Sequence, residues 1–470
     1  MGPTGIWGRG LERTPAVSTR GRRKEPGWLT SAALGSNRLL HVVGLLREPH
    51  TRVRPCHDLR MTLRTAADLH DQILEERLDT LVPMLMERAG LDAWVLTARE
   101  YNEDPVLQTM LPASWRSTSR RRTILLFTHG GTRRVAVARY AVGDAFEGVW
   151  DGGDDSSQMA RLAELLEDAD PRNIGINRSS VFPLADGISS TEYDTLRTHL
   201  PAALSGRLTS AEAAAIGWLE TRLPSERPLL ERACAAAHGM LRTALSGDVI
   251  HPGSTTTADV EWWLVDKAAA AGHETWFHPT CSAQRRGGLH RTSFASKPDR
   301  VVIEPGDLVH IDFGIVAGGY CTDQQQHAYV GSESDTIAEL SAGLSTANRL
   351  QDLLITQFVA GRTGNEILTA TRARAMEEGI DGLIYTHPIG IHGHAAGPTI
   401  GLWDQQDAVP GQGDYPLHPD TAYSIELQAR TTIDSWDGQV VQFMLEEDAF
   451  FDGTGVVFLD GRQTTLWIVQ

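Results

Sequence analysis

The order of hydrophobic and polar residues predicts a helix followed by several short strands in the first part of the chain. Apolar residues recur at helical spacing from Ala66 to Ala89, and Gly90 is the expected stop signal. Runs rich in β-branched and aromatic residues then predict strands at residues 93–97, 123–127 and 134–138. Helical stretches alternate with these strands, so the pattern indicates an α/β layer.

The pattern changes after the segment Leu223-Pro224-Ser225, which marks the expected start of a second domain. Ser225 is placed to cap the helix that follows. A further helix is predicted between Thr256, which forms a capping pair with Asp259, and Gly272. Strands and turns dominate the remaining residues, which indicates an α+β domain.

Chain length supports this division, because 470 residues exceed the size at which one hydrophobic core stops growing. We therefore predict an N-terminal domain at residues 61–221 and a second domain at residues 222–470. Residues 1–60 differ from both, with 11 Lys and Arg against 4 acidic residues and many Gly, Pro and Ser. The glycines argue against an amphipathic targeting helix, so we expect a disordered extension or a misassigned start, with Met61 as the true first residue.

The composition is ordinary for a soluble globular protein, with 41% hydrophobic and 22% charged residues. No apolar run approaches the roughly 18 residues that a membrane span needs. The net charge of -17 argues against a nucleic-acid binder, because affinity for phosphate depends on clustered Lys and Arg. The 4 cysteines lie far apart, which suits neither a disulfide framework nor a structural zinc site. We therefore expect a cytoplasmic protein without membrane or nucleic-acid partners.

A predicted β-hairpin brings two aspartates together. Residues 308–316 and 320–330 have strand character and flank the turn Ala317-Gly318-Gly319. With the loop at Ala317-Gly318, Asp312 and Asp323 lie directly opposite each other. With the loop at Gly318-Gly319, Asp323 faces Gly314, and both aspartates still share a side because side chains alternate along a strand.

Two carboxylates about 5 Å apart on a mostly apolar strand pair repel each other. Burying them costs several kcal/mol unless cations neutralise them, which a pair of metal ions would do. The alternative is a solvated face on which both aspartates are ordinary surface residues. The hairpin alone does not decide between the two.

A loop rich in histidine and glycine runs from His387 to Gly397 and also contains His392 and His394. Glycine lets the backbone take positive φ and approach a ligand closely, and neutral imidazoles can bind a transition metal. A lone histidine is more often a satisfied polar residue than a ligand. Three in one glycine-rich loop make a ligand site an equal alternative.

Glu426 and Glu446 lie in apolar segments with strand character. An acid that points inward without a partner is costly in such surroundings. Because side chains alternate along a strand, Glu426 shares its face with the polar residues Ser424 and Gln428. A solvated strand face is therefore the alternative to a metal site for Glu426. Glu446 has Met444 on its face, which makes a solvated face a weaker explanation.

These features resemble, in order and spacing, the pita-bread metallopeptidases, a family that includes methionine aminopeptidase, aminopeptidase P and prolidase. The resemblance rests on two aspartates 11 residues apart, then His-x-x-Gly-x-x-x-His-x-x-Gly, then two strand glutamates, and spans about residues 222–470. It implies an α+β pita-bread catalytic domain. The preceding α/β domain resembles the N-terminal domain of the prolidase, aminopeptidase P and creatinase branch. The resemblance implies two divalent metal ions, held by Asp312, Asp323, His387, Glu426 and Glu446.

The resemblance also implies how the ligands are divided between the two metal ions. The family equivalents of Asp323 and Glu446 are shared by both ions, and that of His387 binds only one. The oxygen-rich set favours Mn(II), with Co(II) or Zn(II) as alternatives. Glu426 is the expected proton carrier for a metal-activated water.

Two histidines are expected on the substrate side. His394 matches the family histidine that helps to bind substrate and to stabilise the tetrahedral intermediate. His290 resembles the other one, although His278 competes for that role.

The implied function is hydrolysis of an N-terminal peptide bond, of the Xaa-Pro type, with a peptide or small amide as substrate. Three departures from the family bear on Xaa-Pro selectivity: Leu427 replaces Pro, Met444 replaces Arg, and Gln324 to Gln326 replace Thr-Arg. A creatinase-like amidinohydrolase without metals and a catalytically silent binding module on the same fold are the alternatives. The family is commonly dimeric, which makes a homodimer the expected assembly.

Overall fold

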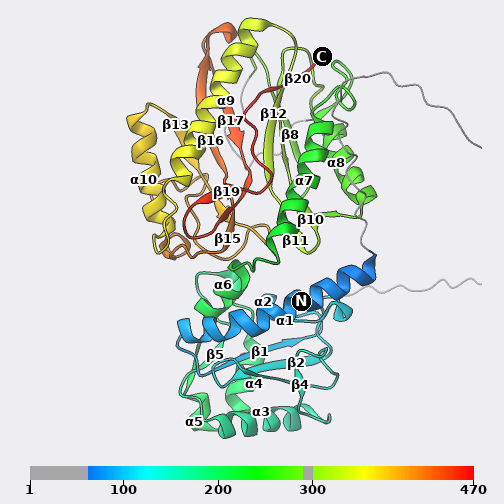
Figure 1. The fold of residues 1–470 in the computed structure, drawn as a ribbon, viewed down its shortest axis with the longest axis vertical. Coiled ribbons are helices and arrows are strands. Elements are labelled where there is room, and N and C mark those ends of the chain that lie inside the picture. The colour runs from blue at the N-terminus through cyan, green and yellow to red at the C-terminus, as the bar shows by residue number, and fades with distance from the viewer. Residues whose placement is uncertain (1–61, 289–299) are drawn as a thin grey trace, which may run out of the picture. The chain divides into compact units, whose positions relative to one another are not determined.

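The computed structural model describes residues 62–288 and 300–470 (Figure 1), so the predicted extension at residues 1–60 lies outside the described residues. Helix α1 (Leu63–Arg88) and strand β1 (Ala93–Arg99) cover the first two predicted elements. Strands β2 (Arg122–Thr128) and β3 (Arg133–Ala138) cover the next two. The periodicity of this part therefore predicted its elements correctly.

These strands belong to a six-stranded sheet with the order β4-β3-β2-β1-β5-β6. Trp94 and Leu96 of β1 pack in one core with α1, whereas Ala93 and Val95 pack in another core with α3. Helices on both faces of one sheet confirm the predicted α/β class. The other elements of this part are β4 (Glu147–Gly148), β5 (Ile174–Ile176), β6 (Leu208–Ser210), α2 (Pro105–Gln108), α3 (Asp155–Ala169), α4 (Ser190–His199), α5 (Ala202–Ser205), α6 (Glu212–Glu220) and 3-10 helices at Ala113–Trp115 and Pro183–Ala185.

Helix α7 (Arg227–Ala244) follows, but its predicted cap is wrong. The residue before the helix is Glu226, and its side chain makes no capping hydrogen bond. Ser225 instead donates its hydroxyl to Glu76 of α1, at 2.7 Å. The prediction for the next helix is correct, because α8 (Thr257–Ala271) begins with a full capping box between Thr256 and Asp259 and ends at Gly272 in the left-handed conformation.

The strands of the second part form four small sheets, with the orders β11-β10-β7, β20-β12-β9-β8, β13-β16-β17 and β14-β15-β18-β19. Helices α7 and α8 pack on the sheet that contains β9, and helices α9 (Ser334–Ile355) and α10 (Gly364–Glu377) pack on the sheet that contains β16 (Figure 1). This arrangement is the predicted α+β class. The strands are β7 (Glu274–Thr275), β8 (Thr280–Gln284), β9 (Leu308–Phe313), β10 (Ile315–Ala317), β11 (Tyr320–Cys321), β12 (Gln324–Val330), β13 (Asp381–Ile384), β14 (His387–Pro388), β15 (Thr421–Ser424), β16 (Leu427–Ile433), β17 (Gln439–Leu445), β18 (Asp448–Phe451), β19 (Val456–Phe458) and β20 (Trp467–Val469), with 3-10 helices at Gln412–Asp414 and Asp434–Trp436.

A buried ionic cluster joins α1 to the segment that precedes α7. Arg77 of α1 donates to Glu226 at 2.7 Å and to the carbonyl of Thr221 at 2.8 Å. Glu226 also accepts from Arg222 and from the Tyr320 hydroxyl, each at 2.9 Å. Two guanidinium groups and a hydroxyl thus surround one carboxylate. Burial opposes its charge, but Arg77 and Arg222 outweigh burial and hold the pKa of Glu226 below its usual range.

Among the described helices, none is both long enough and apolar enough to cross a membrane.

Candidate metal centre

The hairpin that carries the two aspartates turns at Gly318-Gly319. Both glycines have positive φ, at +62° and +88°, and Ala317 pairs with Tyr320. The direct opposition of Asp312 and Asp323 that a loop at Ala317-Gly318 would give is therefore wrong, and the alternative register is correct. Gln325, not Asp323, lies opposite Asp312.

Both aspartates nevertheless reach one site. Carboxylate oxygens of Asp312, Asp323 and Glu446 lie within 4.8 Å of one another. The first strand of the hairpin breaks at Gly314, where a Cβ atom would overlap the carbonyl oxygen of Thr322. Glycine at this position thus allows the two strands to approach closely beside Asp323.

His387 reaches the same carboxylates from the opposite sheet. It lies in β14, and its Nδ1 is 2.9 Å from the carbonyl oxygen of Pro388. A carbonyl only accepts, so Nδ1 carries the proton and Nε2 keeps a free lone pair. Nε2 lies 3.5 Å from Glu446, 3.8 Å from Asp323 and 4.0 Å from Glu426.

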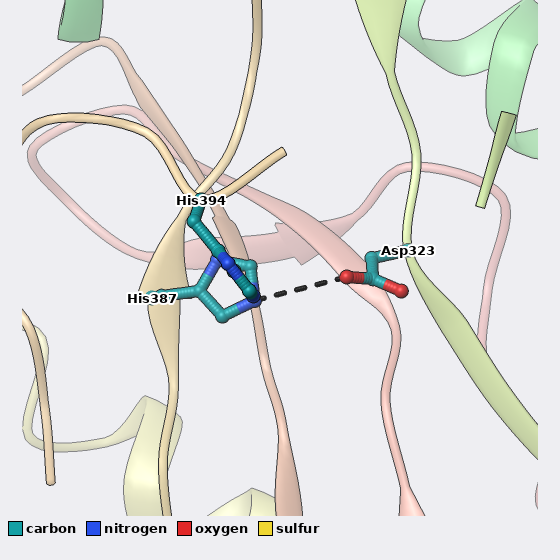
Figure 2. A group of neighbouring side chains, drawn as sticks. All are labelled: Asp323, His387 and His394. Carbon is teal, nitrogen blue, oxygen red and sulfur yellow. Dashed lines mark ion pairs between the residues drawn. The ribbon is translucent and has the colours of Figure 1, made fainter. Parts of the chain in front are cut away.

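His394 lies beside His387, and both rings reach toward Asp323 from the same side (Figure 2). The two imidazole rings are 4.7 Å apart and nearly perpendicular, at 88°. The ring of Trp276 lies 5.1 Å from His394 and would overlap any side chain at Gly393. A nitrogen of His394 lies within 4.8 Å of donor atoms of Asp323 and His387, and His394 is exposed whereas those two residues are buried.

The two glutamates lie at strand ends and not within strands, which corrects the predicted segments. Glu426 falls between β15 and β16, and Glu446 falls between β17 and β18. The backbone of Glu446 bridges to that of Gln325. Donor atoms of Glu426, Glu446 and His387 lie within 4.8 Å of one another.

Three side chains outside the predicted set touch or neighbour these carboxylates. Ser424 donates its hydroxyl to Glu446 Oε1 at 2.6 Å. The Gln325 amide nitrogen lies 2.5 Å from Glu426 Oε1 and 2.7 Å from Glu446 Oε2. Asp448 accepts a hydrogen bond from the backbone nitrogen of Asp323 at 3.1 Å. The only sequence signal for Gln325 was that it departs from the family pattern.

The electrostatics of the cluster call for cations. Burial raises the pKa of Asp312, Asp323 and Glu426 well above the usual range, and the nearby charge of Glu446 raises all three further. Within the described ranges, no Lys or Arg forms an ion pair with any of these carboxylates. The buried atoms Asp312 Oδ1, Asp323 Oδ1 and His387 Nε2 have no hydrogen-bond partner in the structure. Four carboxylates and one imidazole with unused lone pairs fit a site for hard divalent metal ions.

The second predicted substrate-side histidine, His290 or its competitor His278, is not assigned by these contacts. His290 lies outside the described residues. His278 is half exposed, with Nε2 at 3.6 Å from Glu261 and its ring 5.0 Å from that of Trp262. The choice between His278 and His290 stays open.

The three consecutive acids Glu446, Glu447 and Asp448 contact different partners. Glu447 lies 2.6 Å from His238 Nε2, and His238 Nδ1 lies 2.8 Å from Asp460. Burial alone would lower the pKa of His238, but the hydrogen bonds to Glu447 and Asp460 outweigh it and raise the pKa to about 9. A charged imidazole thus neutralises Glu447, next to Glu446 of the carboxylate cluster.

Comparison with known families agrees with this geometry. Residues 228–458 match the model of metallopeptidase family M24. This part of the chain belongs to metallopeptidase family M24. The family predicted from the residue pattern is therefore confirmed, whereas the roles of individual residues and the boundary between residues 221 and 222 stay predictions.

Individual relatives agree with the M24 assignment. A protein of Bacillus subtilis (strain 168) named "Uncharacterized peptidase YqhT" is 32% identical over 101 residues, which is 22% of this chain and 26% of that protein. The match thus spans about a quarter of the relative's length. An Xaa-Pro dipeptidase from Bacillus anthracis superposes with a TM-score of 0.58 at 19% identity, over 86% of this chain and 99% of that one. An X-Pro aminopeptidase from Thermotoga maritima MSB8 superposes with a TM-score of 0.58 at 19% identity, over 82% of this chain and 100% of that one. These structures share the fold of this chain.

Proposed function

We propose that this M24 chain is a dinuclear-metal peptidase that hydrolyses an N-terminal peptide bond, of the Xaa-Pro type. The observation that carries the proposal is the cluster of four carboxylates and His387, buried without a cationic partner and with unused lone pairs. The fold supports it, because similar structures are named as an Xaa-Pro dipeptidase and an X-Pro aminopeptidase.

Five residues would hold the metal ions: Asp312, Asp323, His387, Glu426 and Glu446. Their donor atoms fall into overlapping groups, and Glu446 belongs both to the group with Asp312 and Asp323 and to the group with His387 and Glu426. This overlap supports Glu446 as a ligand shared by two ions. Mn(II) suits such oxygen-rich ligands best, with Co(II) or Zn(II) as alternatives.

Metal ions bound here would supply a water of lowered pKa and would polarise the scissile carbonyl. Glu426 is the proposed proton carrier, because its side chain is 12% exposed whereas that of Glu446 is 1% exposed. A carboxylate at the edge of the site can take the proton of the attacking water and deliver it to the leaving nitrogen.

His394 is the proposed donor to the developing oxyanion. It lies against His387 but is exposed, so it can meet a substrate. The part of the ring that packs inside the site is desolvated, and this partial burial together with the neighbouring His387 lowers the pKa of His394 to about 4, so the imidazole is neutral at pH 7 and donates one N–H. His290 or His278 is the proposed second histidine on the substrate side.

A hydrolysis screen tests the proposal. Protein stripped with a chelator and reloaded with Mn(II) is offered Xaa-Pro dipeptides, longer peptides that begin Xaa-Pro, and peptides that begin with Met. We expect Mn(II)-dependent release of the first residue from an Xaa-Pro substrate. Asp323→Asn, which removes one ligand charge without changing size, is the matched control and should be inactive.

The alternatives give different outcomes in the same screen. A creatinase-like amidinohydrolase would bind no metal and would cleave a small amide without it. A silent binding module would bind metal and cleave nothing. Comparing dipeptides with longer peptides distinguishes a dipeptidase from an aminopeptidase, and the Met peptides show whether proline is required. The predicted cytoplasmic location and homodimer stay predictions.

A further inference from the structure

Gln325 lies at the centre of the metal cluster without being one of its predicted ligands. It is the second residue of β12, lies opposite Asp312 in β9, and is completely buried. Its amide nitrogen contacts Glu426 Oε1 and Glu446 Oε2, which come from two different strand junctions. One side chain thus joins two carboxylates that otherwise repel each other.

The orientation of this amide follows from its partners. The NH2 group donates to Glu426 and to Glu446, which uses both of its hydrogens. The amide oxygen then faces His310 of β9, whose Nε2 lies 2.9 Å away. An amide oxygen also only accepts, so His310 Nε2 carries a proton and donates it.

His310 is itself held in place. Its ring lies 4.9 Å from that of His327, the residue directly opposite it in β12. His327 Nε2 lies within hydrogen-bond distance of the backbone of Met444, two residues before Glu446. The fixed ring of His310 therefore leaves the Gln325 amide a single favourable orientation.

We propose that Gln325, oriented by His310, is a positioning residue that sets the separation of the Glu426 and Glu446 carboxylates and so tunes the affinity and geometry of the metal centre. The inference rests on the proposed dinuclear centre and deepens it. The amide hydrogen bonds neutralise part of the charge on each glutamate and leave Glu426 Oε2 and Glu446 Oε1 directed toward His387. Loss of such an outer hydrogen bond to a ligand typically lowers metal affinity or activity about 10- to 100-fold.

Cobalt binding gives a readout that a purely structural role would not change. Metal-free protein is titrated with Co(II), and affinity is measured by calorimetry while the visible absorption bands report coordination geometry. Gln325→Leu keeps the volume and removes both donors. Gln326→Leu is the matched control, because Gln326 is the next buried glutamine of β12 but donates to Glu447 instead, at 3.1 Å.

Variants of His310 test the same inference if Gln325→Leu does not fold. His310→Leu removes the donor to Gln325, and His310→Gln restores an N–H at a similar distance. We expect Gln325→Leu and His310→Leu to weaken at least one Co(II) site about 10- to 100-fold and to shift its absorption bands. His310→Gln should recover most of the affinity, and Gln326→Leu should bind Co(II) as the wild type does.

The inference is overturned if Gln325→Leu or His310→Leu binds Co(II) with unchanged affinity and spectrum, or if Gln326→Leu shows the same changes as Gln325→Leu. It is also overturned if the wild-type protein binds no Co(II), which would remove the metal centre itself. A wild type that binds Co(II) but cleaves no peptide in the hydrolysis screen would refute the proposed function alone, because the spectra of the variants still decide the role of Gln325.

Discussion

Without metal, the free energy of unfolding of this protein should fall as the pH rises. Paired carboxylates usually have the opposite effect, because they lose their stabilising charge as the pH falls. Burial and the charge of Glu446 raise the pKa of Asp312, Asp323 and Glu426. Between the ordinary pKa near 4 and the raised values, the folded state therefore holds protons that the unfolded state has released. The free energy of unfolding falls as the pH rises through that window.

The three raised carboxylates act in the same direction, so their contributions to the loss of stability add. An ordinary domain has a free energy of unfolding of only roughly 5–15 kcal/mol, so the loss should be measurable. Saturating metal acts in the opposite direction, because an ion at 100 times its dissociation constant stabilises the folded state by about 2.7 kcal/mol per site.

Urea unfolding at pH 5, 6, 7 and 8 measures this effect, with EDTA-treated protein compared with Mn(II)-saturated protein. We expect the stabilisation by Mn(II) to grow steadily with pH. The difference between the two forms isolates the cluster, since the contribution of His238, whose pKa is raised to about 9, is also lost as the pH rises but is the same in both. Asp323→Asn, which removes one carboxylate charge, should flatten the decline of the metal-free protein.

The reasoning is refuted if the metal-free protein becomes more stable between pH 7 and pH 8, or if Mn(II) stabilises it equally at every pH. The first result would mean that the carboxylates are ionised and paired without metal. The second would mean that metal binds elsewhere.

Three further outcomes are expected. Glu426→Gln should abolish turnover, whereas His394→Ala should raise the activation barrier by about 2.7–4 kcal/mol and keep residual activity. Metal occupancy is measured beside kcat for both variants. If His394→Ala is equally inactive and also loses metal, His394 is a ligand. A chain that begins at Met61 should fold and bind Mn(II) as the full chain does, and loss of either would assign residues 1–60 to the domain. Arg77→Met should lower the free energy of unfolding by about 3–5 kcal/mol in urea, because it removes a partner of buried Glu226, and an unchanged value would exclude that role.

The sequence predicted the elements well because they rest on local signals, and the residues that it singled out as metal ligands lie together in the fold. Periodicity located the strands of the first sheet, and the spacing of Thr256 and Asp259 located the start of α8. The hairpin needed only alternation, since either turn position leaves Asp312 and Asp323 on one side. The exact register required knowing which glycines take positive φ, and that depends on the packed turn.

Features that depend on contacts between distant residues could not be predicted from the sequence. Ser225 has the chemistry of a cap, but Glu76 lies close enough to compete for its hydroxyl, and that contact joins residues 149 positions apart. Glu426 and Glu446 looked like strand residues, and only the folded sheets show that both strands break beside them. Gln325 gave no positive signal, because an amide between two carboxylates can be recognised only after those carboxylates have been brought together.

The run Glu446-Glu447-Asp448 also bears on how such chains can vary over evolution. Substituting one of these acids disturbs the contacts of that acid alone. Inserting or deleting a single residue moves each acid into the position of its neighbour, so the contacts of all three change. Glu447 shifted into the place of Glu446 would still offer a carboxylate of the same length to the cluster, but it would leave protonated His238 without its closest partner. The length of this segment should therefore be more strictly maintained among related chains than its composition.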